Sequence, residues 1–224
     1  MKLFIYCAGG FGREIYDTAK RINAALNKWD EICFIDDAGG FDSEFYNARL
    51  FSFDKVLHMF DPNNFEISIA NGEPSVRKSI FEKILSKNLQ LATLVDNTAI
   101  ISETATMEAG VIVTALCSVS CSAALGKNSA INTKAIVGHD VKLGEHTVIS
   151  SLVNIGGASS IGEHSYIGMG VQIKEGINIG KDVIIGMGSV VYNDIPDDVI
   201  ALGNPARPMR KNTEKRVFNR GRIE

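Results

Sequence analysis

Apolar residues recur at every sixth position through the second half of the chain. When the sequence from Ala99 to Asp194 is divided into sixteen consecutive hexads, the third position is apolar every time. These residues are Ile101, Met107, Val113, Val119, Leu125, Ile131, Val137, Leu143, Ile149, Ile155, Ile161, Ile167, Ile173, Ile179, Ile185 and Val191. Six residues make about 1.7 turns of an α-helix, so this period would scatter the apolar side chains around a helix axis. Short strands joined by tight turns, with one inward side chain in each hexad, explain the period.

The first half of the chain alternates between apolar runs and helical spacing. Apolar runs at residues 2–7, 31–35 and 66–70 predict three strands. A helix is predicted over residues 13–26, and a second helix begins at Pro74, a residue that suits the first helical position. The predicted apolar faces are Ile15, Ala19, Ile22 and Leu26 in the first helix and Val76, Ile80, Ile84 and Leu85 in the second. This alternation predicts a small parallel sheet in an α/β domain.

The two patterns meet near residue 95. We expect an α/β domain over residues 1–95, a repeat domain with a closing loop over residues 96–213, and a basic tail over residues 214–224. Basic residues crowd the last eighteen positions: Arg207, Arg210, Lys211, Lys215, Arg216, Arg220 and Arg222. Such a cluster could attract phosphates.

Composition and charge exclude several classes of protein. The 224 residues are 45% hydrophobic and 22% charged, as in ordinary globular proteins, and the net charge of −3 argues against a dedicated nucleic-acid binder. No apolar run approaches the roughly 18–20 residues of a membrane span, and the apolar start of the chain is too short for a secretory signal. Cys7, Cys33, Cys117 and Cys121 show no C-x-x-C spacing, so no zinc or redox site is indicated. We therefore expect a cytoplasmic protein without a metal.

A glycine-rich turn follows the first predicted strand. Gly9 and Gly12 partly match a G-x-G-x-x-G pattern, with Cys7 where the first glycine belongs. Asp36 and Asp37 end the second strand, where an acidic residue could meet a ribose or a base. A nicotinamide dinucleotide, a turn that binds nothing and a nucleotide sugar are all compatible with this pattern. A half-domain of about 95 residues suits a single nucleotide best.

Among the four histidines, His139 has the most suggestive surroundings. It precedes Asp140 and occupies the fifth position of its hexad, so it should point outward from the repeat domain. In the hexapeptide-repeat β-helices that this pattern resembles, three hexads make one coil, so the same position one coil later is Gly157, which leaves room for a substrate beside the imidazole. An imidazole can take a proton at neutral pH, and a neighbouring carboxylate raises its basicity. An exposed histidine without a function is the competing interpretation.

The other histidines indicate no catalytic chemistry. His146 and His164 are 18 residues apart at the sixth hexad position, so they should lie one above the other at a corner of the repeat domain. That placement favours a surface or subunit-contact role, and two imidazoles are too few for a metal site. His58 is expected to be structural or exposed.

The hexad repeat resembles that of the left-handed parallel β-helices of hexapeptide-repeat acyltransferases, in which three hexads make one triangular coil. The segment from Val137 to Gly144 is similar to the catalytic motif of the family that contains sialic-acid O-acetyltransferases and nucleotide-sugar N-acetyltransferases. Members of this family join an N-terminal Rossmann-like domain to a left-handed β-helix, and the resemblance covers essentially the whole chain. It implies about five stacked coils that cover one another's apolar interior.

The resemblance also implies roles for individual residues. His139 matches the general base and Asp140 its acidic partner, while Gly157 would offer its backbone N–H to the thioester carbonyl of acetyl-CoA. The substrate-binding residues implied are Gly9, Gly10, Phe11, Asp36, Asp37 and Gly72 for the nucleotide and Asn132 near the sugar. The cofactor-binding residues implied, besides Gly157, are Met169 and Met187 in the acetyl-CoA groove and Pro205 and Arg207 in the closing loop.

These inferences together predict an acetyl-CoA-dependent N-acetyltransferase that acts on the amine of a nucleotide-linked 4-amino-4,6-dideoxy sugar in surface-polysaccharide synthesis. The family's homotrimer is expected, because one β-helix supplies only one wall of the acetyl-CoA groove. Three alternatives remain open: an O-acetyltransferase of sialic acid or a related free sugar, a non-catalytic sugar-nucleotide binding module, and a nicotinamide-dependent enzyme.

Overall fold

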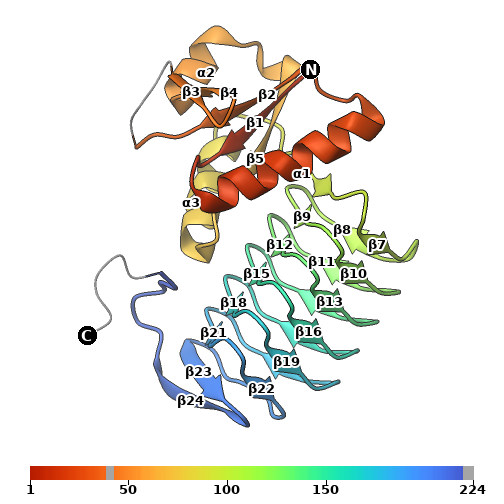
Figure 1. Cartoon of the computed structure of the whole chain (residues 1–224). Coiled ribbons are helices and arrows are strands. Elements are labelled where there is room, and N and C mark those ends of the chain that lie inside the picture. Colours follow the sequence, from red (N-terminus) through yellow and green to blue (C-terminus); the bar gives the residue numbers. More distant parts are fainter. Residues whose placement is uncertain (39–42, 219–224) are drawn as a thin grey trace.

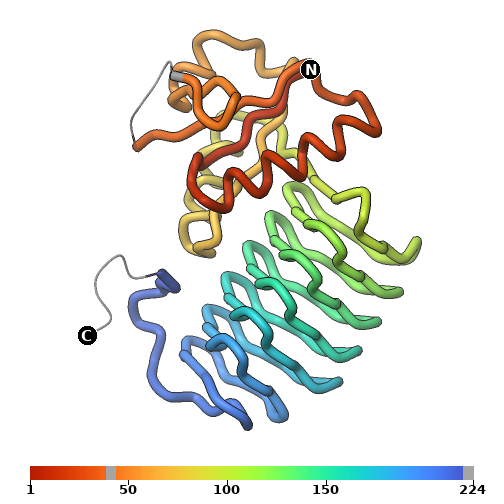
Figure 2. The backbone as a smooth tube through the Cα atoms, in the orientation of Figure 1, coloured from red at the N-terminus to blue at the C-terminus, as the bar shows by residue number. Residues whose placement is uncertain are grey.

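The structure, a computed structural model, describes residues 1–38 and 43–218. An α/β unit is followed by a prism of short parallel strands, and the tail returns along the prism toward the α/β unit (Figures 1 and 2). The expected fold class, a Rossmann-like α/β region followed by a parallel β-helix, is confirmed. Within the described ranges, no helix combines the length and the apolar character needed to cross a membrane.

The α/β unit is built on a five-stranded sheet with the order β3-β4-β2-β1-β5. The strands are β1 (Lys2–Tyr6), β2 (Glu31–Ile35), β3 (Ser43–Phe45), β4 (Ala48–Phe51) and β5 (Phe65–Ile69). The helices are α1 (Gly10–Leu26), α2 (Phe53–Met59) and α3 (Pro74–Leu85), with a short 3-10 helix η1 (Pro62–Asn64). Neighbouring strands are parallel except β3, which pairs antiparallel with β4. Because β2 and β5 lie on opposite sides of β1, the topological switch point of the sheet lies between β1 and β5.

Parts of the α/β unit differ from the prediction. α1 begins at Gly10 rather than at residue 13. The β3–β4 hairpin and α2 have no counterpart in the prediction. The hairpin loop consists of Tyr46 and Asn47 at positive φ and lacks the glycine that usually marks such a loop in a sequence. The predicted apolar faces were wrong at Leu26 of α1 and at Leu85 of α3, which are exposed. The buried residues of α3 are Pro74, Arg77, Phe81 and Ile84.

The prism has three faces, each a parallel sheet of two-residue strands. Face I contains β6 (Leu94–Val95), β9 (Ile112–Val113), β12 (Ala130–Ile131), β15 (Val148–Ile149), β18 (Tyr166–Ile167) and β21 (Ile184–Ile185), and it continues into the longer strands β23 (Val199–Gly203) and β24 (Ala206–Lys211). Face II contains β7 (Ile100–Ile101), β10 (Ser118–Val119), β13 (Ile136–Val137), β16 (Asn154–Ile155), β19 (Gln172–Ile173) and β22 (Val190–Val191). Face III contains β8 (Thr106–Met107), β11 (Ala124–Leu125), β14 (Lys142–Leu143), β17 (Ser160–Ile161) and β20 (Asn178–Ile179).

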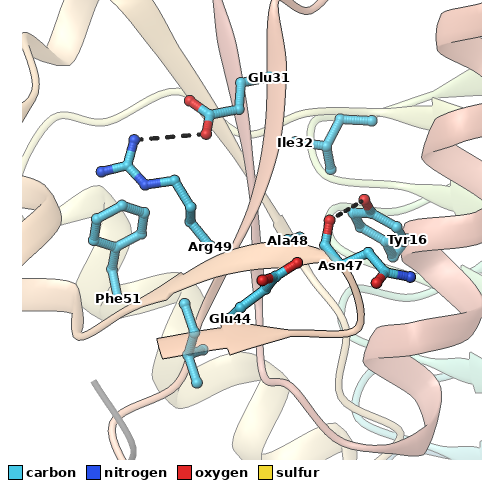
Figure 3. Close-up of a pocket in the computed structure, with 9 residues that line it drawn as sticks. Tyr16, Glu31, Ile32, Glu44, Asn47, Ala48, Arg49 and Phe51 are labelled. Atoms are coloured by element: carbon cyan, nitrogen blue, oxygen red, sulfur yellow. Dashed lines mark hydrogen bonds and ion pairs between the residues drawn. The ribbon is translucent and has the colours of Figure 1, made fainter. Parts of the chain in front are cut away.

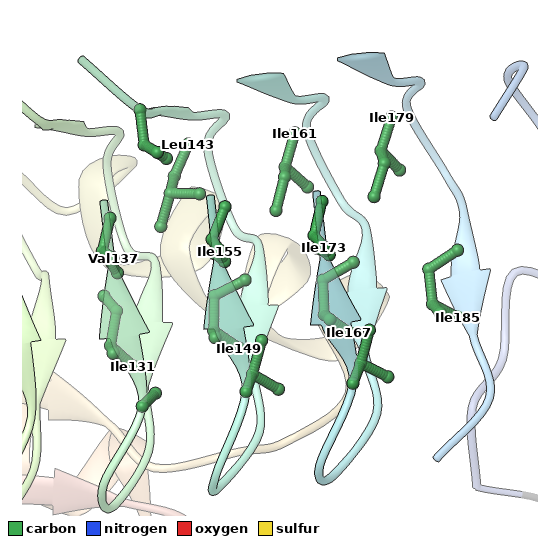
Figure 4. Packing of buried hydrophobic residues seen from close by; sticks show 14 of the residues in the cluster. Ile131, Val137, Leu143, Ile149, Ile155, Ile161, Ile167, Ile173, Ile179 and Ile185 are labelled. Carbon is green, nitrogen blue, oxygen red and sulfur yellow. The ribbon is translucent and has the colours of Figure 1, made fainter. Parts of the chain in front are cut away.

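The hexad determines both the core and the turns of the prism. Each strand pairs with the strand one coil later, as Val137 does with Ile155. The third-position side chains from Val113 to Val191 are buried inside the prism (Figure 4). At many turns the sixth position has a positive φ, including Asp140 at 57°. We name the turns by the faces they join in chain order: edge I–II, edge II–III and edge III–I.

The α/β unit is docked on face I. Outward-pointing Ile112, Ala130 and Val148 of this face are buried in one cluster with Ile15 and Ala19 of α1. On face II, by contrast, Ile100 and Ile136 remain exposed. The predicted boundary near residue 95 falls at β6, the first strand of face I, and the three domain limits stay a prediction.

Candidate active site

The first part of the site lies at the carboxyl ends of β1 and β5, the switch point at which a sheet of this kind forms a ligand-binding crevice. Cys7 directly follows β1 with a φ of 84°, and Gly9 is the N-cap of α1. A Cβ built on Gly9 would meet nothing within 4 Å, so the space above this turn is open. The first turn of α1 has no acidic residue and contains Arg13, and together with the helix dipole this favours an anionic group beside Gly9 and Gly10. Thus the turn has the shape and charge of a phosphate site.

Asp36 and Asp37 follow β2 and are held by the protein in different ways. Asp36 accepts hydrogen bonds from the backbone N–H of Ala8 (2.8 Å) and of Ala38 (2.9 Å), which ties it to the glycine turn. Asp37 accepts hydrogen bonds from the Tyr6 hydroxyl and from Lys83 Nζ (2.8 Å). Burial raises the pKa of Asp37, but the bonds from Lys83 and Tyr6 outweigh it and leave the pKa below its ordinary value. Asp36 is therefore part of the crevice wall, whereas Asp37 anchors the end of β2 to α3.

The opposite wall of the crevice is the turn after β5. Asn71 donates from Nδ2 to Cys7 Sγ (3.4 Å), and its Oδ1 accepts the backbone N–H of Glu73 (2.9 Å). Gly72 lies between them, and a Cβ built there would be 3.4 Å from the ring of Phe218. Phe11, by contrast, packs partly buried against the apolar cluster under α1. The structure therefore brings Gly9, Gly10, Asp36 and Gly72 around one crevice.

The second part of the site is an imidazole on edge II–III. His139 Nδ1 lies 2.8 Å from Asp140 Oδ2, and both side chains are 61% exposed. A Cβ built on Gly157, one coil later, would lie 2.5 Å from His139 Cε1 and closer still to Nε2. The imidazole itself thus lies in the side-chain gap of Gly157, where the sequence-based expectation placed room for a substrate. With Nδ1 held by Asp140, Nε2 is the nitrogen left to accept a proton.

The remaining predicted residues lie on edge I–II, across face II from His139. Asn132, Met169 and Met187 occupy turns of this edge, and both methionines are exposed. Pro205 and Arg207 lie in the β23–β24 hairpin, which joins this edge through the bond from Gly186 N–H to the Ala201 carbonyl (2.8 Å). The peptide bond before Pro205 is cis. Within one protomer, the structure does not bring these five residues to His139.

The prediction of a surface or subunit-contact role was wrong for His146. Its ring is stacked on that of His164 (5.4 Å between centroids, 6° between planes), as the 18-residue spacing predicts. However, His146 is only 3% exposed, because Phe81 of α3 covers it and Asn128 bonds to Nδ1 (2.9 Å). Burial lowers the pKa of His146 to about 4, with a further contribution from His164. This histidine is a neutral element of the contact between α3 and the prism.

A cavity of the α/β unit lies away from both parts of the site. It has a volume of about 590 Å³ and lies between β2, the β3–β4 hairpin and α1 (Figure 3). Its polar lining groups are engaged with one another, as in the Glu31–Arg49 ion pair (3.6 Å) and the bond from the Tyr16 hydroxyl to the Asn47 carbonyl (3.4 Å). None of the predicted site residues lines this cavity.

Three residues of importance to the site have no counterpart in the sequence-based prediction. Arg77 is fully buried and donates to the carbonyls of Ile69 (2.6 Å), Asn71 (3.1 Å) and Asn128 (2.7 Å), so it links the turn after β5 to the prism. The spacing of Pro74, Arg77, Phe81 and Ile84 contains the signal for a buried position 77. The other two residues are Glu73 and Phe218. The Glu73 carboxylate accepts the backbone N–H of Phe218, and no local sequence pattern indicates that contact. Arg220 and Arg222 of the basic cluster lie outside the described residues.

The fold and the His139–Asp140 pair define a hexapeptide-repeat acyltransferase with a Rossmann-like N-terminal unit. Residues 2–84 match the PglD N-terminal domain family, and residues 158–193 match the bacterial transferase hexapeptide family (six repeats). The acetyltransferase domain of PglB from Neisseria gonorrhoeae FA1090 is 31% identical, with a TM-score of 0.86 over 93% of this chain and 99% of that domain. A second structure of that domain is a complex with acetyl coenzyme A. The chain therefore belongs to the hexapeptide-repeat acetyltransferases with a PglD-type N-terminal domain.

More distant structures share the fold. PerB from Caulobacter crescentus, in complex with CoA and GDP-perosamine, is 24% identical, with a TM-score of 0.85 over 94% of this chain and 98% of PerB. WeeI from Acinetobacter baumannii AYE is 23% identical, with a TM-score of 0.85 over 93% of this chain and all of WeeI. The expectation of an acetyl-transferring enzyme of this family is confirmed.

Proposed function

We propose that the protein transfers the acetyl group of acetyl-CoA to the amine of a nucleotide-linked 4-amino-4,6-dideoxy sugar, in the synthesis of a surface polysaccharide. The observation that carries the proposal is the exposed His139 imidazole, paired with Asp140 and lying in the side-chain gap of Gly157. The complex of the similar PglB domain with acetyl coenzyme A supports acetyl-CoA as the donor. A cytoplasmic location agrees with that choice of donor.

The crevice between β1 and β5 would bind the nucleotide part of the acceptor. Its diphosphate would lie at Gly9 and Gly10, at the positive end of α1. Asp36 lies on the β2 side of this turn and Gly72 on the β5 side. The nucleoside would therefore extend toward Asp36, and the sugar would extend past Gly72 toward the prism.

His139 would act as the general base. Its Nδ1–H donates to Asp140 Oδ2, so Nε2 carries the lone pair and takes a proton from the amine as the amine nitrogen attacks the thioester carbon. The negative charge on the carbonyl oxygen would be stabilised by the Gly157 N–H. Collapse of the intermediate breaks the C–S bond, and the CoA thiolate leaves as the thiol by taking the proton from His139 Nε2, which regenerates the base. The acetyl group passes directly to the amine, without an acyl-enzyme.

Three copies of the chain would complete the site. Edge II–III carries His139 and Gly157, edge I–II carries Asn132, Met169 and Met187, and the exposed Ile100 and Ile136 of face II lie between the edges. Packing of three prisms around one axis places edge I–II of one copy beside edge II–III of the next. Acetyl-CoA would then lie between two prisms, with Pro205 and Arg207 at one end of the groove.

The test is release of free thiol from acetyl-CoA with a panel of UDP-, dTDP- and GDP-linked amino sugars, with the matching hydroxy sugars and free sialic acid as controls. Turnover only with the amino sugars is expected. Turnover only with free sialic acid would replace the proposal by O-acetylation, and binding of nucleotide sugars without turnover would indicate a binding module. Nicotinamide absorbance in the purified protein would indicate the dehydrogenase alternative.

A further inference from the structure

The tail of the chain returns to the α/β unit as a strap, residues 214–218, which we call the C-terminal strap (Figures 1 and 2). Lys215 anchors its beginning through ion pairs with Asp182 (2.8 Å) and Asp198 (3.5 Å). At its end, the Glu73 carboxylate accepts the backbone N–H groups of Val217 (2.8 Å) and Phe218 (3.0 Å). Contacts at both ends therefore link the strap to the prism through Asp182 and Asp198 and to the α/β unit through Glu73.

The strap ends at the switch point of the sheet. The Phe218 ring lies over Gly72, and it meets the Tyr166 ring of face I edge to face at 5.6 Å and 83°. Gly72 follows β5, so the ring borders the crevice that begins at Gly9 on the β1 side. Phe218 is nevertheless 54% exposed, so part of its ring surface is open beside Gly72 and Tyr166.

We propose that the C-terminal strap is part of the acceptor site, and that Phe218 packs its exposed ring surface against the apolar C–H face of the acceptor's sugar. The inference rests on the proposed function. It adds to the acceptor site a segment whose Phe218 is 145 residues away in sequence from Glu73, the residue that holds it in place. Phe218 lies on the β5 side of the crevice, opposite the Asp36 side, so the ring contacts the sugar rather than the nucleobase.

The contacts of the strap indicate that it lines the acceptor site. They argue against a plug, that is, a segment that blocks the site until the acceptor displaces it. Glu73 is 7% exposed with the strap in place, and displacement of the strap would remove the bonds from the Val217 and Phe218 N–H groups to its carboxylate. Such a loss is costly, because hydrogen bonds to a charged group are stronger than those between neutral groups. Acceptor binding to an already ordered strap avoids this cost.

The experiment compares Phe218→Ala with wild type in the acetyl-transfer assay and in calorimetry. The KM for the nucleotide amino sugar should rise about fivefold to tenfold, the effect of exposing one or two apolar carbons again. The KM for acetyl-CoA and kcat should stay within about twofold. Calorimetry should show weaker binding of the nucleotide sugar to the variant but equal binding of the nucleoside diphosphate, which has no sugar. Phe218→Leu, which keeps an apolar side chain, should have an intermediate KM.

Two further variants separate the strap from general effects. Leu26→Ala removes another exposed apolar side chain at the far end of α1, about 24 Å along the helix from Gly10, and should change neither KM. Glu73→Gln keeps an acceptor oxygen but loses the charge that orders the strap, so the acceptor KM should rise and the acetyl-CoA KM should not.

Three results for Phe218→Ala would overturn the inference: an unchanged KM for the acceptor, a lowered KM for the acceptor, as expected if the strap is a plug, or an equal loss of affinity for the nucleoside diphosphate. The failure of the proposed function is a separate result, seen as wild-type protein that acetylates no nucleotide amino sugar. Calorimetry still tests the contact in that case, and wild type that binds no nucleotide sugar would overturn the inference as well.

Discussion

His139 and Gly157 occupy the same position on adjacent coils, and the imidazole of His139 fills the space that a side chain at position 157 would need. The missing Cβ therefore allows the ring to lie against the next coil while Nδ1 remains bonded to Asp140. In the proposed reaction, Gly157 positions the base through its missing side chain and offers its backbone N–H to the thioester oxygen.

Gly157→Ala tests this relationship. The new methyl group would collide with Cε1 and Nε2, so the ring must turn away from its position beside the thioester. We expect kcat/KM to fall about a hundredfold, as for other small displacements of reacting groups. The melting temperature should change little, because the His139 side chain is mostly exposed. An unchanged kcat/KM would contradict the claim that Gly157 positions His139 for acetyl transfer.

The hexad period predicted the short strands and turns, and the resemblance to hexapeptide-repeat β-helices, with three hexads to a coil, predicted the prism and the edge that carries His139. It also predicted that His146 stacks on His164. It did not predict that His146 is buried, because a repeat within the prism carries no information about which face the α/β unit covers. Local patterns likewise miss Arg77, whose acceptors include Asn128, 51 residues away. Contacts of this kind become visible only when the two parts are docked.

The buried His146 should make the protein sensitive to acid. Its pKa is lowered from 6.5 to about 4, so the unfolded chain binds a proton between these values and the folded chain does not. The free energy of unfolding should therefore decrease as the pH falls through this window, by about 2 kcal/mol between pH 7.5 and 5. The value of about 4 includes the effect of neighbouring charges: Glu145 raises the pKa of His146, whereas Arg77 and Lys78 lower it.

Urea unfolding of His146→Gln across this pH range measures the effect. Glutamine can still accept the bond from Asn128 but does not titrate, so the variant should lose less stability in acid than wild type. His58→Gln, at an exposed histidine of α2, should behave like wild type. The same pH dependence in His146→Gln and wild type would contradict the assignment.

Arg77 should contribute strongly to stability. Its guanidinium is fully buried, donates to the Ile69, Asn71 and Asn128 oxygens, and has a pKa lowered to about 9 by burial. Arg77→Ala would leave these acceptors without a partner and should cost about 3 kcal/mol in urea unfolding. Arg49→Ala, which removes an exposed guanidinium, should cost less than about 0.5 kcal/mol. Equal losses would mean that the buried contacts do not hold the two parts together.

Cys121 offers a chemical probe of edge II–III. It is exposed and occupies the same hexad position as His139 one coil earlier, whereas Cys33 and Cys117 are buried and burial raises the pKa of the half-buried Cys7 thiol. N-ethylmaleimide should modify Cys121 and inhibit acetyl transfer, because the adduct would narrow the space beside His139. Acetyl-CoA should slow the inhibition, and Cys121→Ser should remain active and resist it. Peptide mass measures the extent of Cys121 modification. Full activity after complete modification would mean that the acetyl-CoA groove does not pass beside Cys121.

The most direct test of the account is the acetyl-transfer rate of His139→Asn, measured as thiol release with the best nucleotide amino sugar. We expect kcat to fall at least about a hundredfold, the contribution of a general base, with both KM values within a few-fold of wild type. The matched variant His58→Asn should keep the wild-type rate. A His139→Asn enzyme as fast as wild type would contradict the central claim that this imidazole removes the proton from the amine.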